Sequence, residues 1–372
     1  MAACAACVMI AAAGIVTAAQ APAAFKTRNV ILITLDGART QEIFGGLDDE
    51  VFRAELAKEK KTPEQSDVYK RFAGATPEER RQKLMPFFWG TWMKQHGSIA
   101  GNRARNSTVQ LTNTHRFSYP GYSEILTGQA HDKEIDSNDK KRNPFPSVLD
   151  FLKERLSLKP AQVAAFTSWD AGPFIASSRE GAFVGNGGYQ AFESTDPVVK
   201  RLSAQQFETL TGWDTVRHDY FTFHFALSHL ASARPRALYM MLGETDDWSH
   251  DHRYDRVLQT LALTDGWFKE LWTWLQSQDD YRDKTTILIT TDHGRGNTPA
   301  DWNTHGEKIE GAQYTWLAAI GPDFSQRGEW HDTPTIGPNQ IAATLATLLG
   351  VGADFTKSNP NAGKPIDVLL AR

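Results

Sequence analysis

Three short, continuous apolar runs constrain the fold of this chain most strongly. They read NVILITL (Asn29–Leu35), ALYMML (Ala237–Leu242) and TTILIT (Thr285–Thr290). Apolar runs of this length, rich in β-branched residues, are typical of parallel strands that are buried on both faces. Amphipathic patterns typical of helices occur at residues 147–156, 255–276 and 339–349. This alternation predicts an α/β fold with a mostly parallel central sheet flanked by helices.

Residues 25–372 are expected to form one domain with insertions. Weaker strands are predicted at residues 162–166 and 314–320. Residues 48–95 are charged and helical, with prolines as breaks, which indicates an insertion over the edge of the sheet. Residues 172–234 are rich in Gly, Ser and aromatic residues before they become helical. We expect this second insertion to form a cap near the substrate.

The composition excludes one large class of function. A chain of 372 residues that is 41% hydrophobic can bury a substantial core. Its formal net charge is -4, so it has no basic excess with which to bind nucleic acid. A small phosphorylated substrate remains compatible with this charge, because bound metal ions can supply positive charge locally.

The first 24 residues form a separate, uncharged segment. It is rich in Ala, Val, Ile and Met and ends in small residues, which is the pattern of a secretory signal peptide. We expect cleavage between Ala19 and Ala24, and export to the periplasm or the medium. The alternatives are an Ala-rich tail or an uncleaved anchor, although stable membrane insertion is disfavoured because Ala is weakly apolar. Both cysteines, Cys4 and Cys7, lie here, so cysteine is expected to play no part in the chemistry.

Carboxylates follow each of the three strong strands. Asp36 follows the first, Asp246 lies just past the second, and Asp292 follows the third. In open α/β sheets, ligands bind outside the carboxyl ends of the strands. Three carboxylates gathered there would repel one another unless cations held them. The alternative is that each Asp caps the turn or helix that follows it.

Histidines near these carboxylates favour a metal centre. His250 follows Asp246 by four residues, a spacing that places both side chains on one face of a helix. His293 directly follows Asp292, and His305 lies in a polar loop further on. Imidazole and carboxylate ligands without thiolates suit zinc, with manganese or iron as weaker choices.

A serine at a predicted helix start supplies a candidate nucleophile. Ser118 precedes a Pro-Gly turn and an apolar helix start, in the sequence RFSYPGYSEILTG. Metal coordination would lower the pKa of its hydroxyl, and backbone N–H groups at a helix start can receive phosphate oxygens. The alternative is a helix-capping serine without chemistry, and Ser123 is then a competing candidate.

The order and spacing of these motifs resemble those of the alkaline phosphatase superfamily. The branch of nucleotide pyrophosphatases and type I phosphodiesterases is the most similar. The matching motifs are L-D-G at residues 35–37, S-x-P at 118–120, T-G at 127–128, D-x-x-x-H at 246–250, D-H-G at 292–294 and H-G at 305–306. Each motif is weak alone, but in this order they span most of the chain.

The resemblance implies two divalent metal ions, zinc or alternatively manganese, and a phosphoseryl intermediate on Ser118. One ion would be held by Asp246, His250 and His305, and the other by Asp36, Asp292 and His293, with Ser118 as its further ligand. Asn138 is the candidate for the family's asparagine that steadies a phosphate oxygen. Gly121 stands where the family frequently has Asn. The implied substrate is a small phosphate ester, while the oligomeric state stays undetermined.

The resemblance also separates this chain from neighbouring enzymes. Sulfatases carry an Arg where Tyr122 stands and paired aspartates where Asp36 is followed by Gly37. A phosphomutase or phosphotransferase, a sulfatase-like hydrolase and a non-catalytic binding protein remain as alternatives. Arg39, near Asp36, would favour a monoester if it contacted a phosphate oxygen. A diester would be favoured if Trp169, Phe174, Tyr189 and Trp248 lined a slot rather than the core.

Overall fold

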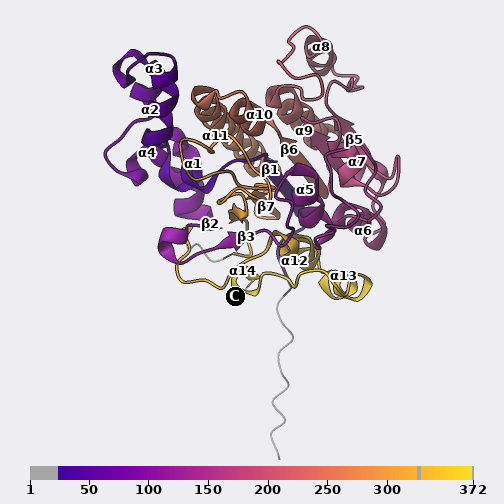
Figure 1. Cartoon of the computed structure of the whole chain (residues 1–372). Coiled ribbons are helices and arrows are strands. Elements are labelled where there is room, and N and C mark those ends of the chain that lie inside the picture. The colour runs from indigo at the N-terminus through magenta and orange to yellow at the C-terminus, as the bar shows by residue number, and fades with distance from the viewer. Residues whose placement is uncertain (1–23, 325–327, 371–372) are drawn as a thin grey trace, which may run out of the picture.

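The computed structural model describes residues 24–324 and 328–370. The predicted signal peptide and both cysteines therefore lie outside the described residues, apart from Ala24 at its end. Within the described ranges, eight strands form one mixed sheet in the order β10-β2-β9-β7-β1-β6-β4-β5 (Figure 1). Strand β1 (Asn29–Leu35) lies inside this sheet, between β7 (Thr285–Thr290) and β6 (Ala237–Leu242).

The central strands confirm the predicted parallel sheet. β1 pairs in parallel with both β6 and β7, and β6 pairs in parallel with β4 (Val163–Thr167). β5 (Val184–Gly187) continues this arrangement at one edge. All residues of β1, β6 and β7 are buried, as their continuous apolar sequences require.

The other side of the sheet contains antiparallel pairs, which the sequence pattern did not predict. β9 (Leu317–Ile320) runs antiparallel to both β7 and β2 (Gly97–Ala100), and β10 (Gly328–Glu329) is parallel to β2. The single strand expected at 314–320 is divided. β8 (Tyr314–Thr315) pairs instead with β3 (Val109–Gln110) in a separate two-stranded sheet. The break falls at Trp316, whose carbonyl accepts a hydrogen bond from the Thr290 hydroxyl at 2.6 Å.

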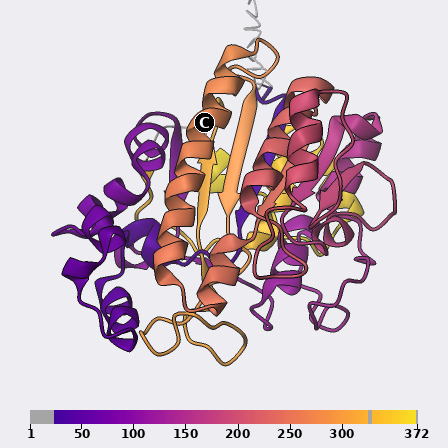
Figure 2. The same cartoon turned by 90° about the horizontal axis from the view of Figure 1, so that it is seen from above.

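Helices cover both faces of the sheet (Figures 1 and 2). Ile31 and Ile33 of β1 point into one core, whereas Val30 and Leu32 point into the other. The first core is covered by α2 (Asp49–Lys58), the π-helix η2 (Phe88–His96), α9 (Asp219–Ala233) and α11 (Tyr254–Ser277). The second is covered by α5 (Ser118–Thr127), α6 (Val148–Arg155), α7 (Gly172–Ala176) and α12 (Ile341–Leu348).

The two predicted insertions differ in character. Residues 48–95 form α2, η1 (Pro63–Gln65), α3 (Asp67–Phe72), α4 (Pro77–Leu84) and η2, and Pro63 and Pro77 each begin a helix, where their missing N–H is harmless. Residues 172–234 are not a simple insertion, because they supply the edge strand β5 and the core helix α9, and a cap near the substrate stays a prediction. Only α8 (Pro197–Gln205) of that segment stands out as a lobe, opposite the lobe of α2 to α4 (Figure 1).

The remaining elements are short. They are α1 (Thr40–Gly45), η3 (Arg103–Arg105), η4 (Pro160–Gln162), α10 (Glu244–His250), η5 (Pro338–Gln340), α13 (Gly352–Ser358) and α14 (Asp367–Leu370). Among the described helices, none combines the length and apolar character needed to cross a membrane.

Candidate active site

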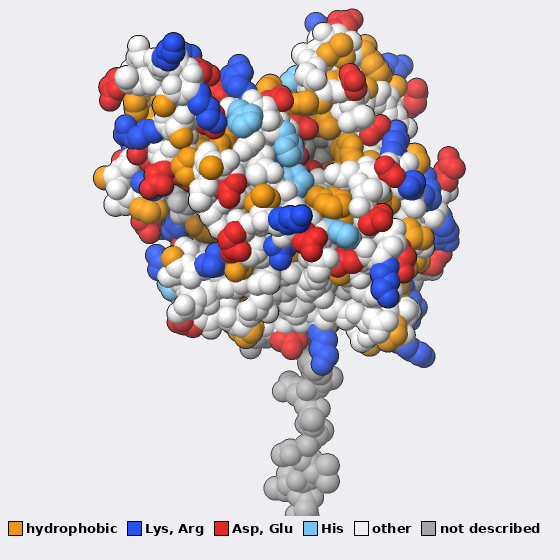
Figure 3. Space-filling view, in the orientation of Figure 1, with side chains coloured by type: hydrophobic (Ala, Val, Ile, Leu, Met, Phe, Trp, Pro, Cys, Tyr) orange, Lys and Arg blue, Asp and Glu red, His pale blue; other side chains and the backbone are white. Residues whose placement is uncertain are grey.

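The carboxyl ends of the central strands bring the predicted site residues together. Asp36 follows β1 directly, Asp292 lies two residues after β7, and Asp246 lies in α10, just past β6. A parallel sheet places these ends at one edge. Figure 3 shows the surface hollowed between the two lobes, with histidine side chains gathered in the hollow.

The first cluster consists of Asp246, His250 and His305. His250 Nε2 lies 3.2 Å from Asp246 Oδ2, one helical turn away on α10, and 3.1 Å from His305 Nε2. His305 Nε2 lies 3.9 Å from Asp246 Oδ1. One ligand atom from each residue lies within 4.8 Å of the others, so the three side chains can hold one metal ion.

The second cluster is centred on His293. Its Nε2 lies 3.4 Å from Asp36 Oδ1, 3.6 Å from Asp246 Oδ1 and 3.5 Å from Asp292 Oδ2. The compact group of three is Asp36, Asp246 and His293, rather than the expected Asp36, Asp292 and His293. Asp292 lies at its side, because its Oδ1 accepts a hydrogen bond from the Gly37 backbone N–H at 3.1 Å. Asp246 therefore lies between the two clusters.

The unsatisfied polar atoms of this region fit divalent cations. Asp36 Oδ1, Asp292 Oδ2 and His305 Nδ1 are buried without hydrogen-bond partners among the described residues. Buried polar atoms are normally paired, and buried carboxylates need a compensating charge. Oxygen and imidazole donors suit zinc or manganese, so the donor set matches the predicted cofactor.

Burial and neighbouring charges shift the pKa values of the three histidines. Burial, followed by repulsion from His293, lowers the pKa of both His250 and His305. These two rings are therefore neutral near pH 7, which is the form that binds metals. Burial also opposes a charge on His293, but Asp292 and Asp36 raise its pKa to about 9 overall. Its Nδ1 donates to the Gly294 carbonyl at 2.9 Å, which leaves Nε2 as the ligand atom once the ring is neutral.

Ser118 is the first residue of α5 and lies beside the second cluster. Its Oγ is 3.4 Å from His293 Nε2, and the residue is 6% exposed. Phe117, not Ser118, is the N-cap of the helix. The competing Ser123 has a structural partner, because its Oγ accepts a hydrogen bond from Asn143 Nδ2 at 3.1 Å. The geometry thus favours Ser118 over Ser123 as the hydroxyl that meets a bound substrate.

Asn138 lies next to Ser118, as the resemblance implied. Its Oδ1 accepts a hydrogen bond from the backbone N–H of Tyr119 at 2.9 Å. Among the described residues, its amide nitrogen has no partner, so two N–H donors stay available beside Ser118. The helix start itself offers fewer backbone donors than expected, because Pro120 has none and the Gly121 N–H binds the Phe117 carbonyl at 3.1 Å.

The close packing at position 121 explains why this chain has glycine where the family frequently has asparagine. A Cβ placed at this position would lie 2.2 Å from the Asp292 carbonyl oxygen and 2.9 Å from the Asp292 carbonyl carbon. Helix α5 therefore touches the backbone at Asp292 directly. Only glycine permits this approach, which holds Ser118 close to His293.

Arg39 does not serve the site in the way proposed from the sequence. It is 2% exposed, pairs with Glu42 and Asp48, and donates to the Gly296 carbonyl at 3.1 Å. The expectation that it contacts a phosphate oxygen is therefore wrong, and with it the argument for a monoester. Two of the aromatic residues proposed to line a slot have partners within the protein. Trp248 packs against Trp213, with 4.6 Å between the ring centroids, and the Tyr189 hydroxyl is hydrogen-bonded to the Thr211 hydroxyl at 2.9 Å.

Two further residues organise the site and were not singled out in the sequence. Arg295 is buried and donates to the Asp246 carboxylate and, at 3.2 Å, to its carbonyl; burial lowers its pKa to about 9. Its position two residues after His293 could have identified Arg295 as a site residue from the sequence. Asp219 caps α10 by accepting from the N–H groups of Gly243 and Glu244, at 2.7 and 3.1 Å. No local sequence pattern marks Asp219.

Comparison with known proteins identifies the fold. No protein-family model and no curated protein matches the sequence. The wild-type alkaline phosphatase PafA is similar in structure, with a TM-score of 0.55 and 10% identity over 95% of this chain and 100% of that chain. A phosphonate monoester hydrolase from Silicibacter pomeroyi has a TM-score of 0.53 and 13% identity, covering 92% and 76%. A Vibrio parahaemolyticus protein in the alkaline phosphatase superfamily has a TM-score of 0.51 and 12% identity, covering 88% and 68%.

The chain therefore has the fold of the alkaline phosphatase superfamily. This confirms the predicted α/β architecture, and it confirms the resemblance as far as the fold. Assignment to the nucleotide pyrophosphatase branch stays a prediction.

Proposed function

We propose that this chain is a metal-dependent hydrolase of phosphate esters in which Ser118 attacks phosphorus. The observation that carries the proposal is the position of the Ser118 hydroxyl. It lies at the start of α5, 3.4 Å from His293 Nε2, next to two clusters of metal-type ligands.

The residues of the two clusters would hold two divalent ions, zinc by donor chemistry and manganese as the alternative. The sets are Asp246, His250 and His305 for one ion, and Asp36, His293, Asp292 and Ser118 for the other, with Asp246 close to both. Bound there, such ions supply positive charge that stabilises phosphate oxygens and lowers the pKa of a serine hydroxyl.

The chain's own residues then position the ester. Ser118 Oγ releases its proton and forms a bond to phosphorus while the bond to the leaving oxygen breaks, and the leaving oxygen takes up a proton. Asn138 holds the first turn of α5 through Tyr119 N–H and offers its free amide hydrogens to a phosphate oxygen. Water then cleaves the phosphoseryl bond and restores Ser118. Positioning and electrostatic stabilisation dominate, as is usual for phosphoryl transfer.

We further propose that the protein acts outside the cytoplasm, on a small phosphate ester. The support is the uncharged leader of residues 1–24 with its small residues near Ala24. Sequencing the N-terminus of exported protein should find a start between Gln20 and Phe25. Met1 intact on soluble cytoplasmic protein would contradict export.

Assays of purified protein with nitrophenyl phosphate, bis(nitrophenyl) phosphate and nitrophenyl sulfate test the activity, with zinc or manganese added. We expect turnover of at least one phosphate ester, and a loss of ~10³-fold in Ser118→Ala, equivalent to roughly 4 kcal/mol of transition-state stabilisation. Ser123→Ala is the matched control and should retain most activity. Preference for the sulfate would favour a sulfatase-like hydrolase, and equal activity of the two variants would contradict Ser118 as nucleophile.

A further inference from the structure

His305 lies in a long loop whose position the sheet alone does not fix. Residues 291–313, all within the described ranges, form no helix or strand between β7 and β8. Loops of this length are uncommon in compact domains, so contacts with other segments must hold them. The ring of His293 is fixed by the Gly294 carbonyl at 2.9 Å, whereas His305 Nδ1 has no partner among the described residues. The position of His305 therefore depends on what anchors its loop.

Trp302, three residues before His305, anchors this loop in the core. It is 1% exposed, and its ring packs edge-on against Tyr254, with 5.0 Å between the ring centroids. The next residue, Asn303, is held as well, because its carbonyl accepts a hydrogen bond from Arg295 Nη1 at 2.6 Å. A displacement of Trp302 would therefore move the backbone that leads to His305.

Glu55, on α2 of the insertion of residues 48–95, binds the indole of Trp302. Trp302 Nε1 donates to Glu55 Oε1 at 2.7 Å, and Lys58 Nζ lies 2.7 Å from the same oxygen. The Glu55 side chain is 12% exposed. His252 Nδ1 lies 3.9 Å from Glu55 Oε1, but it is 54% exposed and adds little. Hydrogen bonds to a carboxylate are roughly twice as strong as those between neutral groups. The insertion thus holds the loop by a partly buried, charge-assisted bond.

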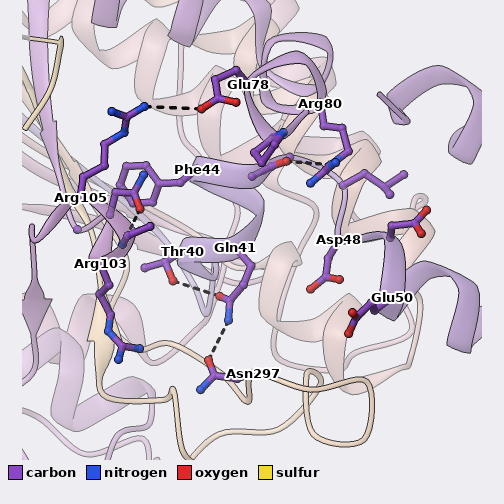
Figure 4. A pocket seen from close by; sticks show the side chains of 18 residues that line it. Thr40, Gln41, Phe44, Asp48, Glu50, Glu78, Arg80, Arg103, Arg105 and Asn297 are labelled. Atoms are coloured by element: carbon purple, nitrogen blue, oxygen red, sulfur yellow. Dashed lines mark hydrogen bonds and ion pairs between the residues drawn. The ribbon is translucent and has the colours of Figure 1, made fainter. Parts of the chain in front are cut away.

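The loop is held less firmly on the side of α1. A cavity of about 850 Å³ lies there, lined by α1, the start of α2, α4, the η3 turn and Asn297 (Figure 4). Gln41 and Asn297 point toward each other in it, and Gln41 Nε2 donates to Asn297 Oδ1 at 2.9 Å. This bond joins two neutral side chains at the surface, so it constrains the loop less than a bond to a carboxylate does. The contact of Glu55 with Trp302 is therefore the stronger of the two.

We propose that Glu55 is a positioning residue for the first metal cluster. Through Trp302, it holds His305 where that ring can share an ion with the rest of the cluster. Contacts that orient a metal ligand without binding the ion commonly change metal affinity by about 10–100-fold. The proposal rests on the proposed metal clusters, and it gives the insertion a part in building the site.

Competition of the full-length, zinc-loaded protein with a chromophoric chelator measures the affinity of each ion. Glu55→Ala should weaken one of the two ions by roughly tenfold or more and leave the other within about twofold. Glu55→Gln keeps an oxygen that accepts from the indole, so it should restore the affinity to within roughly threefold. In cobalt-substituted protein, the visible absorption bands of one ion should change in Glu55→Ala and return in Glu55→Gln.

Two further variants separate this contact from a general effect on stability. Trp302→Phe keeps a buried aromatic ring and removes the N–H donor, so it should weaken the same ion. The double variant Glu55→Ala/Trp302→Phe should weaken that ion no more than the larger single effect, because both changes remove one contact. Glu59→Ala is the matched control, because Glu59 also lies at the end of α2 but pairs with Lys61 at the surface. It should bind both ions as tightly as the unmodified protein.

The outcomes that contradict the proposal differ from those that contradict the metal clusters. If the unmodified protein binds no metal, the clusters are wrong and the role of Glu55 falls with them. If it binds two ions and Glu55→Ala binds both as tightly, only the role of Glu55 is refuted. Equal losses in Glu59→Ala or Glu55→Gln, or equal weakening of both ions, would also overturn it. If Glu55→Ala does not fold, unchanged zinc affinity in Trp302→Phe would overturn it instead.

Discussion

Replacement of Gly121 by alanine tests the packing that holds the candidate nucleophile. The added Cβ would lie 2.2 Å from the Asp292 carbonyl oxygen, and ordinary contacts begin near 3.4 Å. The clash is with backbone, so helix α5 must move away from Asp292 by about 1 Å. Overpacking of this kind destabilises by about 1–3 kcal/mol. A displacement of about 1 Å at the reacting group can cost roughly 10²-fold in turnover.

The matched control is Gly266→Ala. Gly266 is also within a helix, α11, but a Cβ there has nothing within 4 Å. Alanine should stabilise this position by about 0.5–1 kcal/mol, because glycine is a poor helix former. Chemical denaturation and ester hydrolysis rates measure both variants. If Gly121→Ala has the same free energy of unfolding and the same hydrolysis rate as the unmodified protein, the direct contact of α5 with Asp292 is refuted.

Three further predictions concern the metal content, the pH dependence of metal affinity and the buried arginine. Elemental analysis should find about two zinc or similar ions per chain, fewer in His250→Ala and no fewer in His252→Ala. Burial opposes the charge on His293, but Asp292 and Asp36 raise its pKa to about 9, so ligation near neutral pH must release a proton. Metal affinity should then rise with pH up to about 9, and calorimetry in buffers of different protonation enthalpy should detect the proton; pH-independent affinity would contradict this. Arg39→Met leaves buried Glu42 without its cationic partner, although the Tyr254 hydroxyl still donates to it, and should lower the free energy of unfolding by roughly 3–5 kcal/mol. Arg53→Met, which breaks an exposed pair, should change it by about 1 kcal/mol or less in denaturation experiments.

The sequence pattern predicts the centre of this fold well. β1, β6 and β7 begin and end at the predicted residues, because strands buried on both faces must be apolar throughout. The candidate ligands follow these strands, and a parallel sheet brings such positions to one edge. Their proximity was therefore accessible from the sequence, whereas their roles as ligands stay predictions.

Other features depend on contacts between distant segments. β2 and β10 are too short to stand out, and the apolar sequence of β9 does not show that it pairs antiparallel with β7 and β2. Asp246 lies between the clusters on α10, and the start of α10 is capped by Asp219, which lies 27 residues before Asp246 in the sequence. Arg39 appeared free for substrate, but Glu42 reaches it from one turn along α1, and Asp48 reaches it from the N-cap of α2.

The stereochemical course at phosphorus tests the central claim most directly. A phosphorothioate monoester made chiral with two oxygen isotopes would be hydrolysed by the metal-loaded protein in water labelled with the third isotope, and the configuration of the thiophosphate product would be determined by NMR. Attack by Ser118 followed by attack of water makes two in-line displacements. The account therefore predicts net retention of configuration at phosphorus. Net inversion would show that water attacks the ester directly and would contradict the role of Ser118 as the nucleophile.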